Sequence, residues 1–489
     1  ADHVCREEGV RFIRRLLGEN ELRPIVPAHS PVTSSRVLGF QQKTVVGHVT
    51  AGLGCANGCD FCCTSHFFRR KYVKLRGSGS DIYDAMMETK ARAERDGQKM
   101  ASFAIIDEDF FLQKKRALEF LEAVRRGGKP LSIFGFGSIK GLSQFTADEI
   151  AEMGFDLIWT AFEGKKSGYA KLDGKPIAEL YTDLHARGVG VLSSMIIGFP
   201  YQDEGAIRAE FEDLMSLGPD FVQILIYFAF PGTPFFEQVL RDGRFLPRYA
   251  KSADLRRWDG FALHLDHPHF TPEKLEALQK ELYAQDFRRL GPSLHRLTRT
   301  WLRGIENLRG SNNALLRARA ERLRNAAHEV YPTLKGARWL LPSPQSKRRL
   351  DALYREMGRV VGPPSLKSRL MVPGSAMLAA WAEATERLGV LQQPALLRAE
   401  HHTDADGERV CVSDAPGRLQ GIGASVLGRL REDFQHLVVD RLRPPAHDAT
   451  GPVEGWKPVG RVRTSLHVIS GEARCAPDAL SSMEADAAE

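Results

Sequence analysis

Short apolar runs alternate along the first half of the chain with stretches in which apolar residues recur at helical spacing. The apolar runs lie at 44–54, 102–106, 131–136, 155–162, 189–197 and 221–228. Nearly continuous apolar runs are typical of parallel strands that are buried on both faces of a sheet. The pattern therefore predicts six strands with helices between them.

Capping residues mark the ends of the intervening helices. Thr146 and Glu149 form a capping-box sequence, and Ser80 is expected to cap the helix that ends near Gly97. Alternating strands and helices predict a parallel sheet joined by right-handed crossovers. Six strand–helix units are too few to close an eight-fold barrel. We therefore expect an α/β fold, a partial (β/α)6 barrel over residues 41–240 followed by a mainly helical C-terminal region.

The remaining segments follow from proline, glycine and charge patterns. Residues 1–40 predict a short strand, a turn, an amphipathic helix and a proline-containing linker, and residues 241–292 an extension of the barrel. Residues 293–440 predict several helices and a small hairpin at 395–413. The tail 441–489 is rich in Pro, Gly, Ala and acidic residues, which predicts a flexible segment.

Composition places the chain among soluble globular proteins. It has 489 residues, of which 43% are hydrophobic and 26% charged, and its formal net charge of +7 permits an anionic partner without requiring one. The sequence contains no run of ~18 apolar residues, so no membrane span is predicted. The seven cysteines are unevenly placed, with a group between residues 55 and 63, and do not suggest a disulfide framework. We therefore expect a cytoplasmic protein.

One loop carries most of the candidate chemistry. Cys55, Cys59 and Cys62 follow the first predicted strand at CxxxCxxC spacing, in a stretch whose glycines allow close wrapping around a bulky group. Thiolates are the usual ligands of iron–sulfur clusters, which normally take four, so three would leave one iron open to a small molecule. Cys63 or His66 could instead complete a zinc site. A third alternative is that the thiols hold no metal.

This motif, with the aromatic Phe61 just before its last cysteine, resembles the signature of the radical S-adenosylmethionine (radical SAM) superfamily. Three segments at predicted strand ends, FEG at 162–164, IIGFP at 196–200 and FPGTP at 230–234, resemble the branch that carries a cobalamin-binding domain. The resemblance implies a 4Fe-4S cluster held by the three cysteines. Its fourth iron would bind the amine and carboxylate of S-adenosylmethionine, which is then cleaved reductively to a 5′-deoxyadenosyl radical.

The resemblance also implies roles for residues at the carboxyl ends of the strands, where ligands of parallel βα arrays bind. Glu163 would contact the amine or ribose of S-adenosylmethionine, and Gly198 would lie against its adenosine. Asp109 and Ser138 would line the cofactor and substrate cavity. Each has a simpler explanation, because acids after strands often cap helices, glycines make turns, and Glu163 could pair with a lysine two or three residues later.

The first 17 residues resemble the segment that closes a cobalamin-binding domain in this branch. The matches are Asp2, Val4, Arg6, Glu8 and Gly9. The resemblance therefore implies that residues 1–40 include the remnant of an N-terminal cobalamin domain, and that cobalamin is a further cofactor. A short extension that packs on the barrel is the alternative.

Arginines are frequent between residues 293 and 349. In the first predicted helix of this region, Arg296, Arg299 and Arg303 lie off the apolar face that includes Trp301. An amphipathic helix packed on the barrel explains this pattern, and the alternative is a basic surface for an anionic membrane or a nucleic acid. No known nucleic-acid module occurs, so peripheral membrane contact is the preferred form of that alternative.

The leading hypothesis from these patterns is a radical SAM enzyme, namely a cobalamin-dependent methyltransferase acting on an unactivated carbon. Its partners would be a small-molecule or lipid-like substrate and an electron donor such as flavodoxin or ferredoxin. The second hypothesis is a cobalamin-independent radical reaction such as methylthiolation or rearrangement. The third is a zinc-containing protein that binds nucleic acid.

Overall fold

The computed structural model describes residues 9–21, 30–37, 40–164, 166–250, 258–341, 343–387, 399–403 and 409–413, together with residues 3, 5 and 25. The chain divides into two compact units, Ala1–Ala382 and Glu383–Glu489. In the second unit, β10 (Ala399–Thr403) pairs antiparallel with β11 (Arg409–Ser413). The tail 441–489 and the matched N-terminal residues Asp2, Val4, Arg6 and Glu8 lie outside the described residues.

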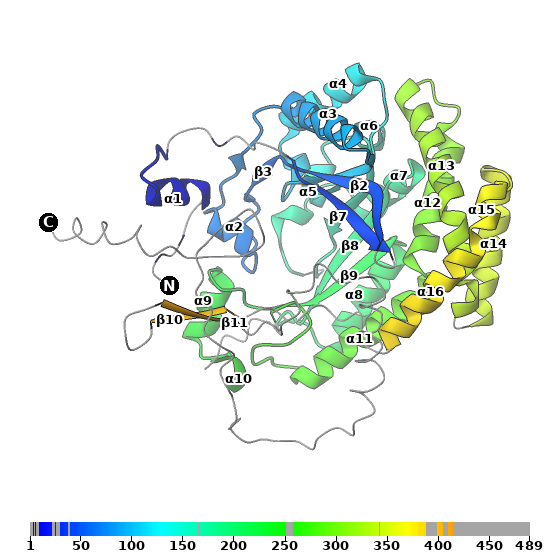
Figure 1. Cartoon of the computed structure of the whole chain (residues 1–489). Coiled ribbons are helices and arrows are strands. Elements are labelled where there is room, and N and C mark those ends of the chain that lie inside the picture. The colour runs from blue at the N-terminus through cyan, green and yellow to red at the C-terminus, as the bar shows by residue number, and fades with distance from the viewer. Residues whose placement is uncertain are drawn as a thin grey trace. The chain divides into compact units, whose positions relative to one another are not determined.

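A curled sheet of seven strands, in the order β1-β2-β5-β6-β7-β8-β9, forms the centre of the first unit (Figure 1). Its strands are β1 (Val32–Val37), β2 (Phe40–Thr50), β5 (Lys99–Ile106), β6 (Ile133–Phe136), β7 (Phe155–Ala161), β8 (Gly190–Ile197) and β9 (Phe221–Ile226). All neighbouring pairs from β2 to β9 are parallel, whereas β1 pairs antiparallel with β2 at the edge. The sheet has the form of half a barrel, and the predicted α/β class is confirmed.

Strand β1 is an element that the hydrophobic pattern does not predict, because it falls in the stretch expected to be a linker. Val32 pairs with Gly47 and Val37 with Phe40, with an irregularity in register between Ser34 and Arg36. An edge strand needs only one hydrogen-bonding neighbour and can remain polar on its open side. Its short, mixed sequence therefore carries no strong strand signal.

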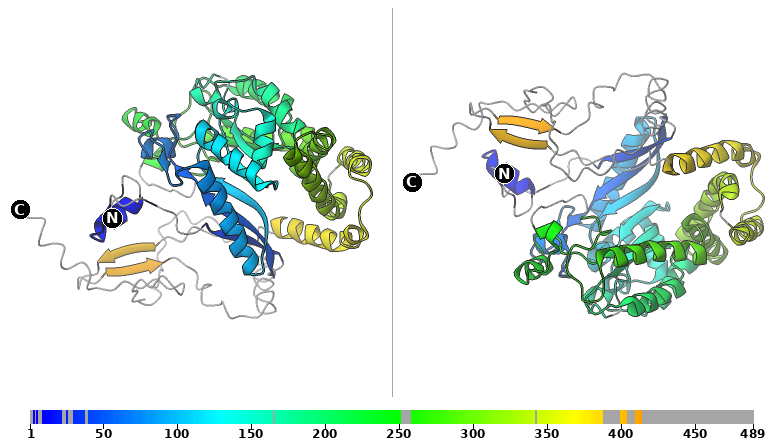
Figure 2. Two further views of the ribbon diagram at one scale, coloured as in Figure 1. Left: turned by 90° about the horizontal axis from the view of Figure 1, so that it is seen from above. Right: turned by 90° about the horizontal axis from the view of Figure 1, so that it is seen from below.

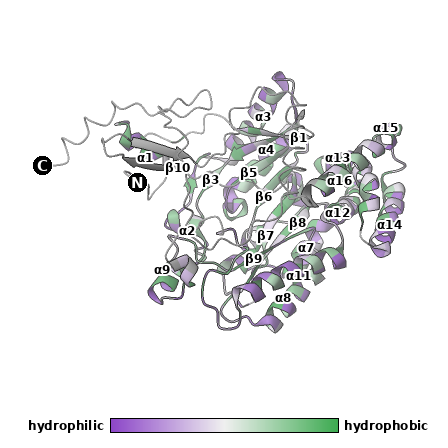
Figure 3. Ribbon diagram, turned by 60° about the horizontal axis from the view of Figure 1, so that its bottom comes forward, coloured by the Kyte–Doolittle hydropathy of each residue, from purple (hydrophilic) through white to green (hydrophobic). Residues whose placement is uncertain are grey.

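Helices pack along the curled sheet, as the views from above and below show (Figure 2). They are α3 (Gly79–Arg95), α4 (Lys114–Gly127), α6 (Ala147–Met153), α7 (Ile177–Ala186), α8 (Glu204–Ser216) and α11 (Pro272–Leu290). The strands are largely apolar, and the helices are mixed, with hydrophilic residues along much of their length (Figure 3). The fully buried rings of Phe110, Phe111, Phe120 and Phe155 contact one another beneath α4 and stabilise this packing.

Helix α3 begins two residues earlier than its sequence suggests. Ser78, not Ser80, is the cap: its hydroxyl accepts from Asp81 N at 3.1 Å, and the Asp81 carboxylate accepts from Ser78 N at 2.8 Å. Gly79 explains the position, because a Cβ there would lie 2.1 Å from Phe120 N, so α3 starts in direct contact with α4. The capping box of Thr146 and Glu149 is confirmed.

Shorter elements surround the carboxyl ends of the strands. The two-residue strands β3 (Gly52–Leu53) and β4 (Val73–Lys74) pair antiparallel on either side of the cysteine loop. The others are α2 (Cys63–Phe67), α5 (Ile139–Leu142), α9 (Pro234–Arg241), α10 (Pro247–Ala250), and the 3-10 turns η1 (Phe110–Leu112) and η2 (Ala170–Leu172). Helix α1 (Gly9–Leu16) lies near the N-terminus of the chain.

The C-terminal part of the first unit is helical. It contains α12 (Ser293–Leu308), α13 (Ala314–Gly336), η4 (Ala337–Leu340), α14 (Pro344–Val360), α15 (Leu366–Leu370) and most of α16 (Val372–Arg387). Helix α12 packs closely against the end of α7, since a Cβ on Gly304 would lie 2.5 Å from the Cα of Gly188. None of the described helices is both long and apolar enough to traverse a lipid bilayer.

Several arginines of these helices are ion-paired rather than free. Arg296 donates to both carboxylate oxygens of Asp286, at 2.8 and 3.0 Å. Arg319, whose side chain is 1% exposed, and Arg322 both bind Asp156 on β7. These pairs fix α12 and α13 to the strands and helices around the sheet, so the packing explanation accounts for these arginines.

Candidate functional site

A pocket of about 180 Å³ opens at the carboxyl ends of the parallel strands. Its lining includes most of the site residues that the sequence predicts, namely Cys55, Cys59, Phe61, Cys62, Asp109, Ser138 and Glu163. The thiols and Phe61 come from the loop between β3 and α2, whereas Asp109, Ser138 and Glu163 follow β5, β6 and β7. Parallel strands end at one edge of the sheet, which brings these distant segments together.

Gly198 has a different position. It follows β8 with φ of +85°, and a Cβ there would lie 2.8 Å from Leu275 Cδ2 on α11. It is not among the described residues that line the pocket. The positive φ and the close packing of the turn against α11 explain why glycine occupies this position.

Of the three thiols, that of Cys59 is buried, and those of Cys55 and Cys62 are partly buried. Burial raises the pKa of Cys55 to about 11 and that of Cys59 to about 12, and it also raises the pKa of Cys62. Cys55 Sγ accepts hydrogen bonds from the Asn57 backbone N at 3.5 Å and from its Nδ2 at 3.2 Å. Without a metal the thiols are therefore protonated near neutral pH, and a bound metal would displace their protons.

The zinc alternative lacks a formed site. His66 Nε2 lies 3.0 Å from the carbonyl oxygen of Cys59, and Cys63 is not among the described residues that line the pocket. Within the described part of the chain, no group of three or more His, Cys, Asp or Glu is arranged to hold a single metal ion. A multi-iron cluster differs from zinc in this respect, because its thiolate ligands bind separate irons and do not converge on one point.

The cysteine loop is anchored by Asp60, a residue whose role is not evident from the sequence. Tyr169 donates its hydroxyl to Asp60 Oδ1 at 2.6 Å, and Tyr227 donates to Oδ2 at 3.1 Å. The ring of Phe61 meets both tyrosine rings edge-on, with centroids 5.4 and 5.9 Å apart. This clamp connects the loop to segments after β7 and β9, and the position of Asp60 inside the cysteine motif is its one sequence signal.

Glu163 is the most unusual acid of the pocket. It is 4% exposed and adopts a positive φ of 54°, a backbone region that is strained for non-glycine residues and is often found at functional sites. Its Oε1 is ion-paired with Lys171 and not with Lys166, and Lys165 lies outside the described residues. Its Oε2 is buried and has no hydrogen-bond partner among the described residues.

Lys171, which the sequence analysis missed, places a cation next to the thiols. Its Nζ lies 5.3 Å from the centroid of the Phe61 ring. Burial is the largest influence on Lys171 and lowers its pKa, but the Glu163 carboxylate together with the nearby Cys59 and Cys62 raises the pKa by more, so it lies above its usual value and the ammonium stays charged. No motif marks this lysine in the sequence, because it reaches the pocket from η2.

The two aspartates after β5 have different roles. Asp107 forms a buried ion pair with Arg116 at 2.6 Å and accepts the Tyr72 hydroxyl, so it is explained by packing. Asp109 lines the pocket and accepts from Ser138 N and Asn57 Nδ2, each at 3.1 Å. Burial raises the pKa of Asp109, and these hydrogen bonds oppose the rise only in part. Asp109 thus positions the Asn57 amide that donates to Cys55.

Comparison with known proteins gives methyltransferases as relatives. The chain is 24% identical over 254 residues to bacteriochlorophyllide d C-12(1)-methyltransferase of Chlorobaculum tepidum, an alignment that covers 48% of this chain and 51% of that protein. It is 23% identical over 242 residues to an uncharacterized methyltransferase of Pyrococcus horikoshii, covering 48% of this chain and 50% of that protein. The chain thus spans about half the length of the curated relatives it matches. No family model matches it.

These comparisons correct the family assignment made from the cysteine motif. Membership of the radical SAM superfamily, in its cobalamin-associated branch, is wrong as a family assignment, since no family model matches and the relatives are distant. The physical reason is that an eight-residue loop constrains which ligand can bind but says little about the ancestry of the whole chain. What the comparisons support is the coarser statement that distant relatives are methyltransferases, which is consistent with an enzyme of that class.

Proposed function

We propose that this chain is the catalytic part of a methyltransferase that uses S-adenosylmethionine, and that its thiol pocket holds an iron–sulfur cluster. One observation carries the proposal: three thiols share a pocket with a buried glutamate whose Oε2 has no partner among the described residues. Thiolates suit iron, and a carboxylate suits the ammonium of S-adenosylmethionine. The names of the relatives support methyl transfer as the reaction class.

Cys55, Cys59 and Cys62 would hold the cluster, which when bound supplies a single electron to the cosubstrate. Glu163 would accept the cosubstrate ammonium, because its carboxylate is already oriented by a strained backbone and a single cation. The pocket of about 180 Å³ is smaller than the ~300–1,000 Å³ of usual ligand pockets, and Lys171 stands within it. We therefore propose that Lys171 moves aside when the cosubstrate enters.

We further propose that cobalamin carries the methyl group. The residues that match a cobalamin-domain segment, apart from Gly9, lie outside the described residues. The proposed substrate is a small or lipid-like molecule.

The test is anaerobic reconstitution with iron and sulfide. The protein should bind iron in a form with broad absorbance near ~400 nm, and after reduction its EPR signal should change on adding S-adenosylmethionine. Replacing Cys55, Cys59 or Cys62 with alanine should abolish both signals. Cys63→Ala, a matched control one residue away, should keep them. Stoichiometric zinc without iron in anaerobically prepared protein would overturn the proposal.

A further inference from the structure

The segment from the end of helix α2 to strand β4 presents an unusual group of exposed side chains beside the cysteine loop. Arg69, Arg70, Lys71 and Lys74 are all exposed, and Phe67 next to them is 42% exposed. None of these four cations forms an ion pair with any residue that the structure describes. We call these five residues the basic turn. It contrasts with the arginines of α12 and α13, many of which are paired with acids.

The backbone of the basic turn is strained. Arg69 and Arg70 have φ of +53° and +58°, and with Glu163 they are the non-glycine residues in the described chain that adopt positive φ. The conformation is pinned by hydrogen bonds from Arg69 N to His66 O at 2.9 Å and from Arg70 N to Ser65 O at 2.7 Å. Glycine would adopt these angles without strain. The presence of arginine at two strained positions suggests that the positive charge has a function that compensates for the backbone strain.

The basic turn lies directly on the loop that carries the thiols. A Cβ on Gly58, the residue before Cys59, would lie 2.4 Å from Arg70 Nε, and a Cβ on Gly54, before Cys55, would lie 2.3 Å from Lys71 O. Helix α2 itself begins at Cys63, immediately after Cys62. The exposed cations Arg70 and Lys71 therefore belong to residues in direct contact with the loop that carries the thiols.

We propose that the basic turn is the docking surface for an acidic one-electron carrier protein; this inference rests on the proposed function. Cations that have no ion-pair partner among the described residues favour an acidic partner, and exposed aromatic residues and arginines are enriched in protein interfaces. The reduced carrier loses one electron to the group held by Cys55, Cys59 and Cys62, and no covalent bond forms or breaks. A compact patch on the thiol loop favours such a carrier over a membrane or a nucleic acid, which would need a wider basic surface.

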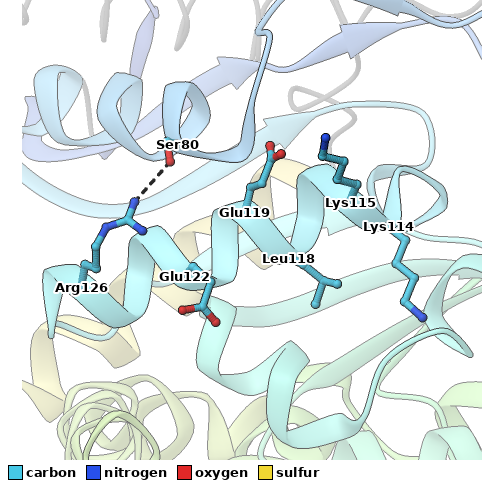
Figure 4. Close-up of a pocket in the computed structure, with 7 residues that line it drawn as sticks. All are labelled: Ser80, Lys114, Lys115, Leu118, Glu119, Glu122 and Arg126. Atoms are coloured by element: carbon cyan, nitrogen blue, oxygen red, sulfur yellow. Dashed lines mark hydrogen bonds between the residues drawn. The ribbon is translucent and has the colours of Figure 1, made fainter.

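A second groove provides the control surface. It lies between α3 and α4, has a volume of about 670 Å³, and is lined by Lys114, Lys115, Glu119, Glu122 and Arg126, with Ser80 opposite (Figure 4). Its lysines are exposed, like the cations of the basic turn, but glutamates on the same helix lie among them. Helix α4 lies away from α2 in both Figure 1 and Figure 3.

The experiment compares two variants with equal loss of charge. R69G/R70G removes two cations and relieves the positive-φ strain, so it should fold at least as well as the natural sequence. K114Q/K115Q removes two cations from the control groove, at the start of α4, where lysine does not favour the helix. Binding of oxidised flavodoxin, an acidic carrier, is measured by calorimetry at low salt for metal-free and iron-loaded protein. Reduction of the loaded protein is then followed with reduced flavodoxin and with dithionite.

R69G/R70G should weaken flavodoxin binding and slow reduction by flavodoxin about tenfold, while reduction by dithionite is unchanged. K114Q/K115Q should leave all three measurements as they are. Equal flavodoxin binding by both variants, or binding to phosphatidylserine vesicles or duplex DNA instead of flavodoxin, would overturn the docking proposal. Failure of the proposed function is a separate result, because the protein would then hold no iron while the binding measurement on metal-free protein still decides the surface.

Discussion

The thiol pocket and the arginine-rich helices differ in how their charged groups are paired. In α12 and α13, Arg296, Arg319 and Arg322 each meet a carboxylate within 3 Å. In the pocket, Glu163 keeps one buried oxygen without a partner among the described residues, and the thiols are held protonated by burial. The difference teaches that paired charges here maintain the fold, whereas incompletely paired groups mark the place where a ligand is expected.

Local strain follows the same division. The described non-glycine residues with positive φ, Arg69, Arg70 and Glu163, all adjoin the thiol loop or its pocket. Strained conformations persist only when the surrounding structure over-determines them, and they cluster at functional sites. The helices that carry the paired arginines show no such residue within their described ranges.

Removing the shared carboxylate of the helical region should give the largest loss of stability. Asp156→Ala leaves Arg319 buried without its charge partner, and breaking a buried pair costs about 3–5 kcal/mol. Urea unfolding measures the loss. The matched control is Arg303→Ala, an exposed change in α12 that should alter stability by no more than about 0.5 kcal/mol. A loss below about 1 kcal/mol for Asp156→Ala would show that the pairing does not maintain the fold.

The same pair predicts a pH dependence. Burial would raise the pKa of Asp156, but Arg322 and Arg319 outweigh it, so the pKa is lowered. Its contribution to stability is therefore present above about pH 4 and is lost as the pH falls through the lowered folded value. The difference in unfolding free energy between the natural sequence and Asp156→Ala should shrink as the pH falls below about 4. A difference that stays constant down to pH 2 contradicts this assignment.

The Asp60 clamp should give the next largest effect. Asp60→Ala removes two hydrogen bonds to a charged acceptor and leaves the hydroxyls of Tyr169 and Tyr227 without it, at a cost of about 2–4 kcal/mol. The amount of iron bound per chain after reconstitution should also fall, because the clamp holds the loop that carries the thiols. Asp96→Ala, an exposed change at the end of α3, serves as control. Normal iron content in Asp60→Ala would rule out the anchoring role.

The effects of replacing Glu163 and Lys171 on stability should not be additive, because the two side chains form an ion pair. Lys171→Met leaves a buried carboxylate without its cation and should cost about 1–3 kcal/mol. Adding Glu163→Gln removes that charge, so the double variant should recover part of the loss. A double-mutant cycle should give a coupling energy of about 0.5–3 kcal/mol. Strict additivity would mean that the two side chains do not interact in solution.

Asn57 should give the smallest effect on stability. Asn57→Ala removes an amide donor to Cys55 Sγ and should cost about 0.5–1.5 kcal/mol. Because hydrogen bonds to ligand sulfurs help set cluster potentials, the reduction potential of reconstituted protein should become more negative. Asn307→Ala on α12 removes a comparable amide hydrogen bond, to Ala186 O, far from the thiols in the sequence, and should leave the reduction potential unchanged. An unchanged potential in Asn57→Ala would separate this amide from the chemistry of the site.

The sequence by itself determined the features that local spacing encodes. Apolar runs predicted the parallel strands, because burial on both faces leaves no polar alternation. The three thiols were visible because a loop of eight residues can supply several ligands without help from the fold. Their gathering with Asp109, Ser138 and Glu163 also follows from local pattern, since the ends of parallel strands meet at one edge. The hydrophobic pattern did not predict strand β1, because an edge strand can form from a mixed sequence.

Only the tertiary structure decided which charged and polar groups meet. Asp60 binds tyrosines that are 109 and 167 residues further along the chain, and Arg322 reaches back 166 residues to Asp156. No short-range periodicity carries such pairings, because they depend on how the sheet curls and where α13 packs. For the same reason the sequence could not separate the paired arginines of α12 and α13 from the cations of the basic turn, which have no ion-pair partner in the part of the chain that the structure describes. Charge count is a property of composition, whereas pairing is a property of distance in the folded chain.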